Sequence, residues 1–361
     1  MKFKMKIEIS NFVTIKFAAV LVFAFAQSSH AQSDSTRPLY EENFIAPPGL
    51  FPANHSSTLV ELPDGRIFAC WYAGAKEGAH DVQIYCSYQD FGSENWSAPT
   101  VAVKRKERAR MAALKNKSLG NPVLYLDNEN ILWLFYSSVA VGGWSLAFVD
   151  YKTSRDFGLT WSKSRRLRWM PGNLTRAKPL QLDQDHMMLP LYKELYKKQG
   201  YTCILQLKRG KIVGKRCDNI PGQHHLQPAL VQNGDRILAY LRTDKSHAVE
   251  FSQYINGKWS KTKSTNLPNP NSSVDVLSTS SGRILLVYNH SASERTPLSL
   301  AISDDGEHFE KIWDFENEIA PGNFSYPAFI QSSDGFYHLS YTYHIRAAIK
   351  HVTFNGKWLG F

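Results

Sequence analysis

Side chains that can transfer protons stand beside two short apolar segments near the start of the chain. His55 opens the first segment, and a histidine, whose ordinary pKa is near neutral, can do acid–base chemistry at physiological pH. Glu77 and Asp81 follow the second segment, on a loop that contains Gly74 and Gly78. Catalytic groups collect on loops at the open end of a rigid scaffold, so we predict that Glu77 or Asp81 acts as a general acid. A wall histidine and a surface acidic pair are the structural alternatives.

Three arginines follow apolar segments farther along the chain. Arg242, Arg295 and Arg346 stand at or shortly after the ends of such segments. Guanidinium groups that converge from separate segments would bind a planar carboxylate through paired hydrogen bonds. Taken one at a time, each is explained equally well as a surface or salt-bridging arginine.

The elements that must position these residues form a repeat. Six times, an apolar run ends at a turn and is followed by a second apolar run. The six units start at His55, Asn121, Lys178, Gln227, Ser273 and Tyr326, so that successive starts lie 66, 57, 49, 46 and 53 residues apart. A repeat of about 50 residues built from short strands is typical of a radial array of blades. The sequence therefore predicts an all-β, six-bladed β-propeller that forms a single domain over residues 32–361. The extended segment 38–52 is expected to add an outer strand to the last blade and so close the ring.

A second periodic pattern lies on the expected outer strands. Residues 154–161 read S-x-D-x-G-x-T-W, and weaker copies occur at residues 87–96, 252–259 and 303–309. In this Asp-box motif the aspartate accepts hydrogen bonds within a tight turn, the glycine takes a left-handed conformation and the tryptophan packs between sheets. The motif favours the propeller fold and supplies no catalytic carboxylate.

The first 31 residues have the pattern of a secretory signal. Lysines precede an apolar stretch at residues 17–26, and Ser29-His30-Ala31 offers small residues at a cleavage site. The apolar run is too short to span a bilayer, and no later run approaches the required length. We therefore expect an exported protein, periplasmic or secreted, without stable membrane insertion.

The charge balance favours an acidic ligand. The full chain has a net charge of +10; without the signal's four lysines and one glutamate, 38 basic and 31 acidic residues remain, a net +7. That excess suits a sialylated or uronate-bearing glycan, with ordinary solubility as the alternative. A nucleic-acid partner is not expected, because the chain is predicted to be exported and carries no recognised binding motif. The basic, alanine-rich segment 104–115 predicts a short helix or an ordered loop.

Four cysteines occur in two pairs on consecutive expected strands. Cys70 and Cys86 belong to the first blade, and Cys203 and Cys217 to the third. An exported compartment would permit a disulfide in each pair, but we favour buried thiols. The C-x-x-C spacing of a structural zinc site does not occur, so we expect no metal and no cofactor.

The ordered set of motifs resembles a known family. His55-Ser56-Ser57, Leu62-Pro63-Asp64-Gly65-Arg66 and Glu77-Gly78 are similar to motifs of the predicted-neuraminidase group of bacterial BNR-repeat proteins. Further matches are Gly120-Asn121-Pro122, Pro190-Leu191-Tyr192, Gln227-Pro228, residues 268–272, Tyr326-Pro327-Ala328 and Tyr341-Thr342-Tyr343. The resemblance covers nearly the whole chain after the signal.

The resemblance implies a sialidase-like, exo-acting glycoside hydrolase that releases a terminal acidic sugar. It places the nucleophile of such enzymes, a tyrosine on the inner strand of the last blade, at Tyr326, and we assign Glu194 or Asp275 as its base. A tyrosine avoids the repulsion that a carboxylate nucleophile would meet at a carbon bearing a carboxylate. Two positions depart from the family pattern: His55 stands where an arginine is usual, and Pro327 follows Tyr326 where a small polar residue is usual.

Other side chains are expected to contact the sugar. Inner strands begin near the common axis, so we expect Asn121, Lys178, Gln227, Asn271 and Asp275 to line the channel and bond sugar hydroxyls. Tyr343 could stack on a sugar face, with core packing as the alternative. We expect a monomer.

Two other functions remain open. The same channel could serve a hydrolase of uronate- or rhamnose-linked polysaccharides, or a polysaccharide lyase that uses His55 and Tyr326. A glycan-binding propeller without catalysis is the third reading, although clustered ionisable groups argue against it.

Overall fold

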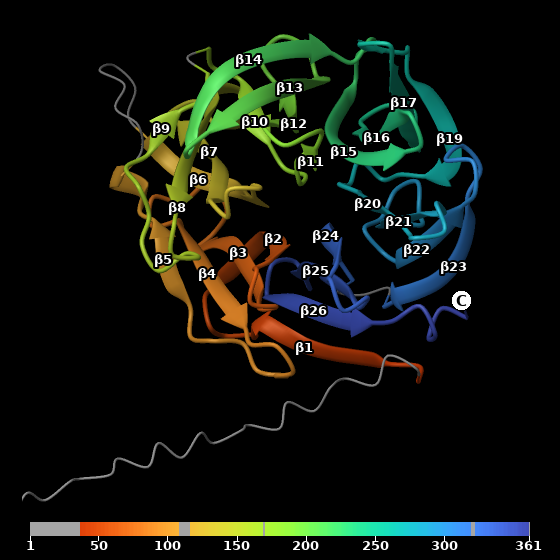
Figure 1. The fold of residues 1–361 in the computed structure, drawn as a ribbon, viewed down its shortest axis with the longest axis horizontal. Coiled ribbons are helices and arrows are strands. Elements are labelled where there is room, and N and C mark those ends of the chain that lie inside the picture. Colours follow the sequence, from red (N-terminus) through yellow and green to blue (C-terminus); the bar gives the residue numbers. More distant parts are fainter. Residues whose placement is uncertain (1–36, 108–115, 169, 319–321, 361) are drawn as a thin grey trace, which may run out of the picture. The chain divides into compact units, whose positions relative to one another are not determined.

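Nearly all regular structure in the computed structural model is β-strand. The model describes residues 37–107, 116–168, 170–318 and 322–360, and in these ranges 26 strands form six antiparallel sheets around a common axis (Figure 1). The chain divides into two units, residues 1–33 and residues 34–361, and all six sheets belong to the second unit. The predicted signal at residues 1–31 lies outside the described residues. The expected six-bladed β-propeller is confirmed.

Each blade is a meander whose first strand lies nearest the axis. Blade one contains β2 (Ala53–Glu61), β3 (Ile67–Gly74), β4 (Gln83–Gln89) and β5 (Thr100–Val103). Blade two contains β6 (Asn116–Leu126), β7 (Leu132–Ala140), β8 (Ala147–Ser154) and β9 (Arg165–Arg166). Blade three contains β10 (Asn173–Thr175), β11 (Leu180–Gln181), β12 (His186–Lys193), β13 (Gln199–Lys208) and β14 (Lys211–Asn219).

The second half of the ring repeats this plan. Blade four contains β15 (His225–Asn233), β16 (Arg236–Thr243), β17 (Ala248–Ile255), β18 (Lys258–Trp259) and β19 (Lys263–Pro268). Blade five contains β20 (Asp275–Ser278), β21 (Ile284–Asn289), β22 (Leu298–Ser303) and β23 (Glu310–Glu316). Blade six contains β24 (Ser325–Gln331), β25 (Tyr337–Tyr343), β26 (Ala348–Phe354) and, from the other end of the chain, β1 (Tyr40–Ala46).

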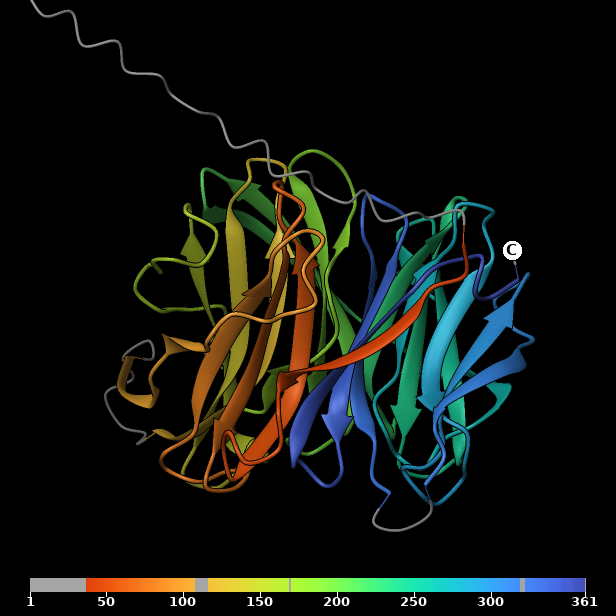
Figure 2. The same ribbon diagram turned by 90° about the horizontal axis from the view of Figure 1, so that it is seen from below.

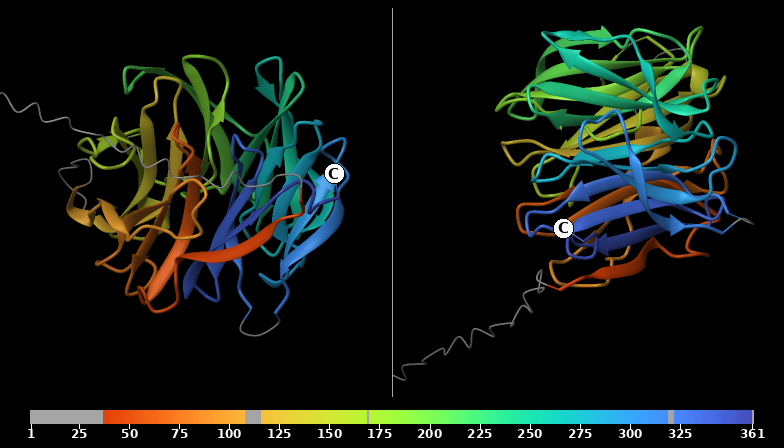
Figure 3. Two further views of the ribbon diagram at one scale, coloured as in Figure 1. Left: turned by 60° about the horizontal axis from the view of Figure 1, so that its bottom comes forward. Right: turned by 90° about the vertical axis from the view of Figure 1, so that its right-hand side faces the viewer.

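The N-terminal strand closes the ring. β1 pairs antiparallel with β26, with Tyr40 opposite Phe354, and lies along the outside of blade six (Figures 2 and 3). The prediction that segment 38–52 completes the last blade is confirmed. Asn43 on β1 also reaches blade one, because its Nδ2 donates to the Glu94 carbonyl at 2.9 Å and its Oδ1 accepts from Trp96 Nε1 at 3.2 Å.

Apolar side chains fill the spaces between blades. Between blades two and three, for example, Trp133, Phe135 and Val149 pack with Leu189 and Cys203, all fully buried. Alternate residues of each strand face the two neighbouring blades, so both faces of every sheet are covered and the strands read as nearly continuous apolar runs. This packing fixes the inner strands that surround the axis.

The Asp-box at residues 154–161 has the structural role expected of it. The Asp156 carboxylate accepts from the Thr160 amide at 2.8 Å, and Ser154 Oγ donates to Asp156 at 2.7 Å. Gly158 has φ of +91°, and a Cβ there would lie 2.4 Å from the Phe68 ring of blade one, so only glycine fits.

Both cysteine pairs form disulfides, so the preference for buried thiols was wrong. Cys70 lies directly opposite Cys86 in the β3–β4 ladder, and Cys203 opposite Cys217 in the β13–β14 ladder. Their Cα atoms are 4.1 and 4.0 Å apart. Directly opposed residues of an antiparallel pair bring their side chains together, and the strand register, which spacing alone did not give, decides the bond.

Four inner strands carry an irregularity at the same place. The ladder skips two residues in β2, β6, β15 and β24, namely Ser56-Ser57, Asn121-Pro122, Gln227-Pro228 and Tyr326-Pro327. The first residue of each pair has φ between 46° and 58°, and Asn271, just before β20, has φ of 57°. A bulge re-aims a side chain that regular pleating would point into the blade. Backbone strain repeated at one blade position is a mark of a functional site.

Segment 104–115 is only partly described. Residues 105–107 form a single 3₁₀ turn, and residues 108–115 lie outside the described ranges. Over the ranges that are described, the chain contains no helix of the length and apolarity needed to cross a bilayer.

Candidate active site

Tyr326 stands among side chains from four other blades. Its hydroxyl accepts a hydrogen bond from Arg242 Nη1 at 3.4 Å. The guanidinium carbons of Arg176 and Arg295 lie 5.1 and 5.9 Å from the centroid of its ring, and the ring of His55 lies 4.3 Å from it, centroid to centroid. Residues separated by up to 271 positions thus meet where the inner strands approach the axis. We call Tyr326, His55, Arg176, Arg242 and Arg295 the axial cluster.

The axial cluster makes Tyr326 more acidic than an ordinary tyrosine. Burial raises the pKa of Tyr326, but the positive charges of Arg242 and Arg295 and a hydrogen bond from Gln227 outweigh it and hold the pKa below its ordinary value. Cations stabilise the phenolate form, which is the nucleophilic form of the side chain.

His55 is a buried, neutral base. Its Nδ1 lies 2.8 Å from Thr342 Oγ1, and its ring makes an edge contact with Tyr72. Burial, followed by the charges of Arg346 and Arg295, holds the pKa of His55 well below its ordinary value. The imidazole is therefore uncharged at neutral pH, which suits proton abstraction rather than anion binding.

The three predicted arginines come together. Arg242 Nε donates to Asn271 Oδ1 at 2.8 Å and its Nη1 to Gln227 Oε1 at 3.2 Å, while Arg295 Nη2 donates to the Asn271 carbonyl at 3.4 Å. Burial, with the nearby charges of Arg242 and Arg346, lowers the pKa of Arg295. Predicted channel residues Gln227 and Asn271 thus hold the arginines in place rather than standing apart from them.

Of the two predicted acids, only Glu77 reaches the axial cluster. Its carboxylate forms an ion pair with Arg346. Its charge adds to the burial that raises the pKa of Tyr72, and it partly opposes the arginines that lower the pKa of Tyr326. Asp81 is exposed, and its Oδ2 accepts from the Ala75 amide at 2.9 Å, so it caps its own loop. Of the two, Glu77 is therefore the carboxylate whose charge acts on Tyr326.

The two predicted bases differ in availability. Asp275 is buried, with Oδ1 bonded to Lys178 Nζ at 2.7 Å and Oδ2 to the Phe329 amide at 2.7 Å. Lys178 and Asp275 thus tie blades three, five and six together, which does not favour Asp275 as a base. Glu194 is half-buried; burial raises its pKa, and its charge raises the pKa of Tyr192. The Tyr192 hydroxyl in turn accepts from Asn121 at 3.1 Å and from Gln227 at 3.2 Å.

Tyr343 lies elsewhere. Its ring packs against Phe44 of β1, Phe324 and His344, and Lys350 Nζ lies 5.2 Å from it. These contacts belong to the core of blade six and explain the residue by packing.

Arg176 was not predicted. It is only 3% exposed, its Nη2 donates to the Pro327 carbonyl at 2.7 Å, and its Nε has no hydrogen-bond partner among the described residues. Burial lowers the pKa of Arg176, and the nearby Asp275 and Tyr326 oppose that effect. Burying a guanidinium N–H without a hydrogen-bond acceptor costs free energy, unless a ligand or a water molecule accepts the bond. The repeat pattern pointed to Lys178, two residues later, because the inner edge of blade three is interrupted over residues 176–179, between β10 and β11, where four other blades skip only two residues.

The comparison with protein-family models decides the family. The model described as the BNR repeat-like domain matches residues 65–339, from the turn before β3 to β25. The chain belongs to this family. The match begins after His55 and ends before Arg346, so those two positions come from the structure and not from the family model.

Several solved structures similar to this BNR repeat-like domain are sialidases. Hadza microbial sialidase Hz136 has 12% identity and a TM-score of 0.73, over 88% of this chain and 68% of that chain. The intramolecular trans-sialidase from Ruminococcus gnavus has 14% identity and a TM-score of 0.68, over 85% and 95% of the two chains. A protein of unknown function from Dyadobacter fermentans has 11% identity and a TM-score of 0.68, over 87% and 98%. The search among curated proteins found no match. At these identities the likeness shows the fold.

Within this BNR repeat-like domain the axial cluster can bind an anion and supply a nucleophile. Arg176, Arg242 and Arg295 surround one tyrosine, and Glu77 and His55 add an acid and a base. The described residues contain no group of three or more His, Cys, Asp or Glu side chains arranged to hold a metal ion.

Proposed function

We propose that the protein is an exported, sialidase-like glycoside hydrolase that releases a terminal acidic sugar from glycans. The proposal rests on Tyr326 and the arginines around it. Their positive charges lower the pKa of Tyr326, and their guanidinium groups offer a carboxylate-binding surface beside it. The sialidase neighbours of the fold and the predicted signal sequence support it further.

The proposed reaction divides into binding and displacement. Arg242 and Arg295 bind the carboxylate on the anomeric carbon. The Tyr326 oxygen attacks that carbon while its bond to the leaving oxygen breaks, and Glu77 donates a proton to that oxygen. Glu194, whose pKa is raised by burial, accepts the Tyr326 proton through Tyr192, which interacts electrostatically with both groups. Water, deprotonated by Glu77, then attacks the anomeric carbon as the bond from that carbon to the Tyr326 oxygen breaks, and the proton held by Glu194 returns to the tyrosine, so that the free sugar is released.

The first test is the Tyr326→Phe variant against a panel of sialylated and uronate-containing glycans, with products identified by mass. We expect the wild type to release an acidic monosaccharide and the variant to lose about 1,000-fold or more in kcat, since removing a nucleophile costs orders of magnitude. The thermal unfolding midpoint should stay close to that of the wild type. Near-normal turnover in the variant would exclude the tyrosine mechanism.

A polysaccharide lyase is the second candidate, because one contact favours it. The centroid of the neutral His55 ring lies 4.3 Å from the centroid of the Tyr326 ring. In addition, the side chain that hydrogen-bonds to Tyr326 is the amide of Gln227 and not a carboxylate. In that reaction His55 removes the proton next to a uronate carboxylate held by the arginines. The C–O bond to the neighbouring sugar breaks as a carbon–carbon double bond forms, and Tyr326 protonates the leaving oxygen.

Ultraviolet absorbance separates the two candidates. Elimination yields an unsaturated, absorbing uronate, whereas hydrolysis yields a saturated sugar. A rise in absorbance on uronate polymers that is lost in His55→Ala, with no sugar released from sialylated glycans, would replace the hydrolase proposal by the lyase.

A further inference from the structure

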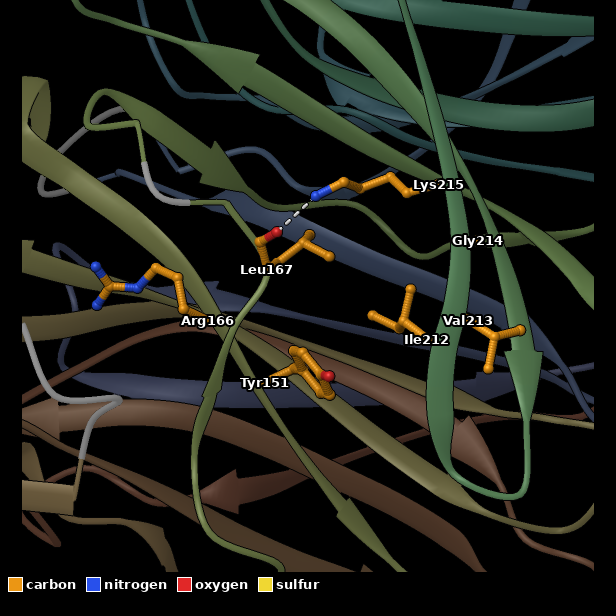
Figure 4. Close-up of a pocket in the computed structure, with 7 residues that line it drawn as sticks. All are labelled: Tyr151, Arg166, Leu167, Ile212, Val213, Gly214 and Lys215. Atoms are coloured by element: carbon orange, nitrogen blue, oxygen red, sulfur yellow. Dashed lines mark hydrogen bonds between the residues drawn. The ribbon is translucent and has the colours of Figure 1, made fainter.

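A pocket lies far from the axial cluster, between the outer strands of blades two and three. It has a volume of about 280 Å³ and is lined by Tyr151 of β8, Arg166, Leu167 and residues 212–215 of β14 (Figure 4). Lys215 crosses its edge, since its Nζ donates to the Leu167 carbonyl at 2.8 Å. This volume lies just below the range of about 300–1,000 Å³ typical of small-molecule pockets, so we consider a single sugar unit as its ligand.

The walls of the pocket differ in character. Tyr151 and Leu167 are buried members of the core between the two blades, and Ile212 packs against that core from β14. Arg166 points away from the other lining residues and pairs with Asp150, its Nε 2.5 Å from the carboxylate (Figure 4). One wall is therefore apolar and aromatic, and Lys215 supplies the accessible charge.

Positive charge lies near the Lys215 edge of the pocket, on Arg168, which does not itself line it. Arg168 and Lys193 lie over the ring of Tyr201, at 5.4 and 5.0 Å from its centroid. Burial and then the charge of Arg168 lower the pKa of both Lys193 and Lys215, which puts Arg168 close to each lysine. Among the described residues, no carboxylate pairs with Lys215, Arg168 or Lys193; Lys193 donates instead to Asn219 Oδ1.

We propose that this pocket is a second saccharide-binding site, in which a carboxylate-bearing sugar packs against Tyr151 and Leu167 while Lys215, backed by Arg168, binds its carboxylate. Sugar rings present apolar C–H faces that pack on aromatic and aliphatic walls, and an uncompensated cationic edge favours an anion. The choice of an acidic sugar rests on the proposed function.

Calorimetric titration tests the proposal in an Arg242→Ala background, which weakens carboxylate binding at the axis. The probes are trigalacturonate, 3′-sialyllactose and the neutral galactotriose. We expect one of the acidic probes to bind at least tenfold more tightly than galactotriose. Adding Lys215→Glu should weaken that binding at least tenfold, whereas the same charge change at Lys258, an exposed residue of blade four, should change it less than twofold.

Three outcomes would overturn the proposal: no binding of either acidic probe, equal weakening by Lys215→Glu and Lys258→Glu, or equally tight binding of inorganic polyphosphate, which would indicate a general polyanion surface. Circular dichroism of each variant checks the fold. The experiment needs no turnover, so a failure of the proposed hydrolase leaves it interpretable.

Discussion

Tyr326 owes its acidity to neighbours that the chain supplies from separate blades. Arg242 touches the hydroxyl, while Arg176 and Arg295 lie over the ring. Arg176 also bonds the Pro327 carbonyl and so holds the strained turn that presents the tyrosine. It is a positioning residue for Tyr326 and adds positive charge beside the site.

Arg176→Met should raise the pKa of Tyr326, because the guanidinium beside the ring is an opposite charge that stabilises the phenolate. Ultraviolet difference titration measures the pKa of Tyr326, after the titration curve of the double variant Arg176→Met/Tyr326→Phe has been subtracted to remove the other tyrosines. Arg176→Lys keeps the charge and should restore much of the shift. If Arg176 only stabilised the fold, its replacement would change the unfolding midpoint and leave the pKa of Tyr326 unchanged.

At the scale of the element, blade six contains a pair of buried histidines. His338 on β25 and His351 on β26 stack with centroids 5.3 Å apart, and Nδ1 of His338 lies 3.2 Å from Nε2 of His351. Burial lowers the pKa of His338 to about 4, and burial with the charge of His338 lowers the pKa of His351 well below its ordinary value. Both are neutral in the folded protein.

The stability of the protein should fall as pH falls from about 6.5 towards 4. In that window the unfolded chain binds protons on these histidines and the folded protein does not, which costs up to about 1.4 kcal/mol per pH unit for each. Urea unfolding at pH 7 and pH 5 measures the effect. The variant His338→Gln should be less stable at pH 7 yet lose less on acidification; an unchanged pH dependence would contradict the assignment.

The Cys203–Cys217 disulfide joins neighbouring strands across 14 positions. Closing a loop of about 15 residues stabilises by about 3 kcal/mol through the unfolded chain. We expect Cys203→Ala/Cys217→Ala to lose about that much in urea unfolding. The variant should keep the activity of the wild type on short substrates, since the pair lies on β13 and β14, the outer strands of blade three, and not among the residues of the axial cluster. A loss below about 0.5 kcal/mol would show that the bond contributes little.

At the scale of the whole molecule, the ring depends on one strand. Asn43 on β1 bonds Glu94 and Trp96 of blade one, and its Oδ1 lies 3.0 Å from His351 Nδ1 of blade six. Asn43→Ala removes all three bonds and should destabilise by about 2–3 kcal/mol, at about 1 kcal/mol for each bond. Differential scanning calorimetry measures it, and Glu41→Ala, an exposed change on the same strand, serves as the control. Equal midpoints for the two variants would remove the role of Asn43.

The fold could be predicted from the sequence because six repeats, turn residues and one good Asp-box all agree. The meeting of Arg242, Arg295, Arg346 and Tyr326 followed from blade equivalence alone. Arg176 could not be predicted, because its position depends on where the third inner strand leaves its ladder. The disulfides could not be predicted because they depend on which residues face each other in the strand register. The roles of Asp275 and Asp81 could not be predicted because each carboxylate is bound by a backbone amide, and such contacts cannot be read from residue types.

The ring is closed by pairing β1, which is synthesised early, with β26, which is synthesised late. β1 is among the first strands to leave the ribosome, yet its partner β26 does not exist until residue 354 has been added. The growing chain therefore carries an unpaired strand edge while five other blades form, and such an edge invites pairing with other chains. The newborn protein should bind chaperones through β1 until the last blade arrives.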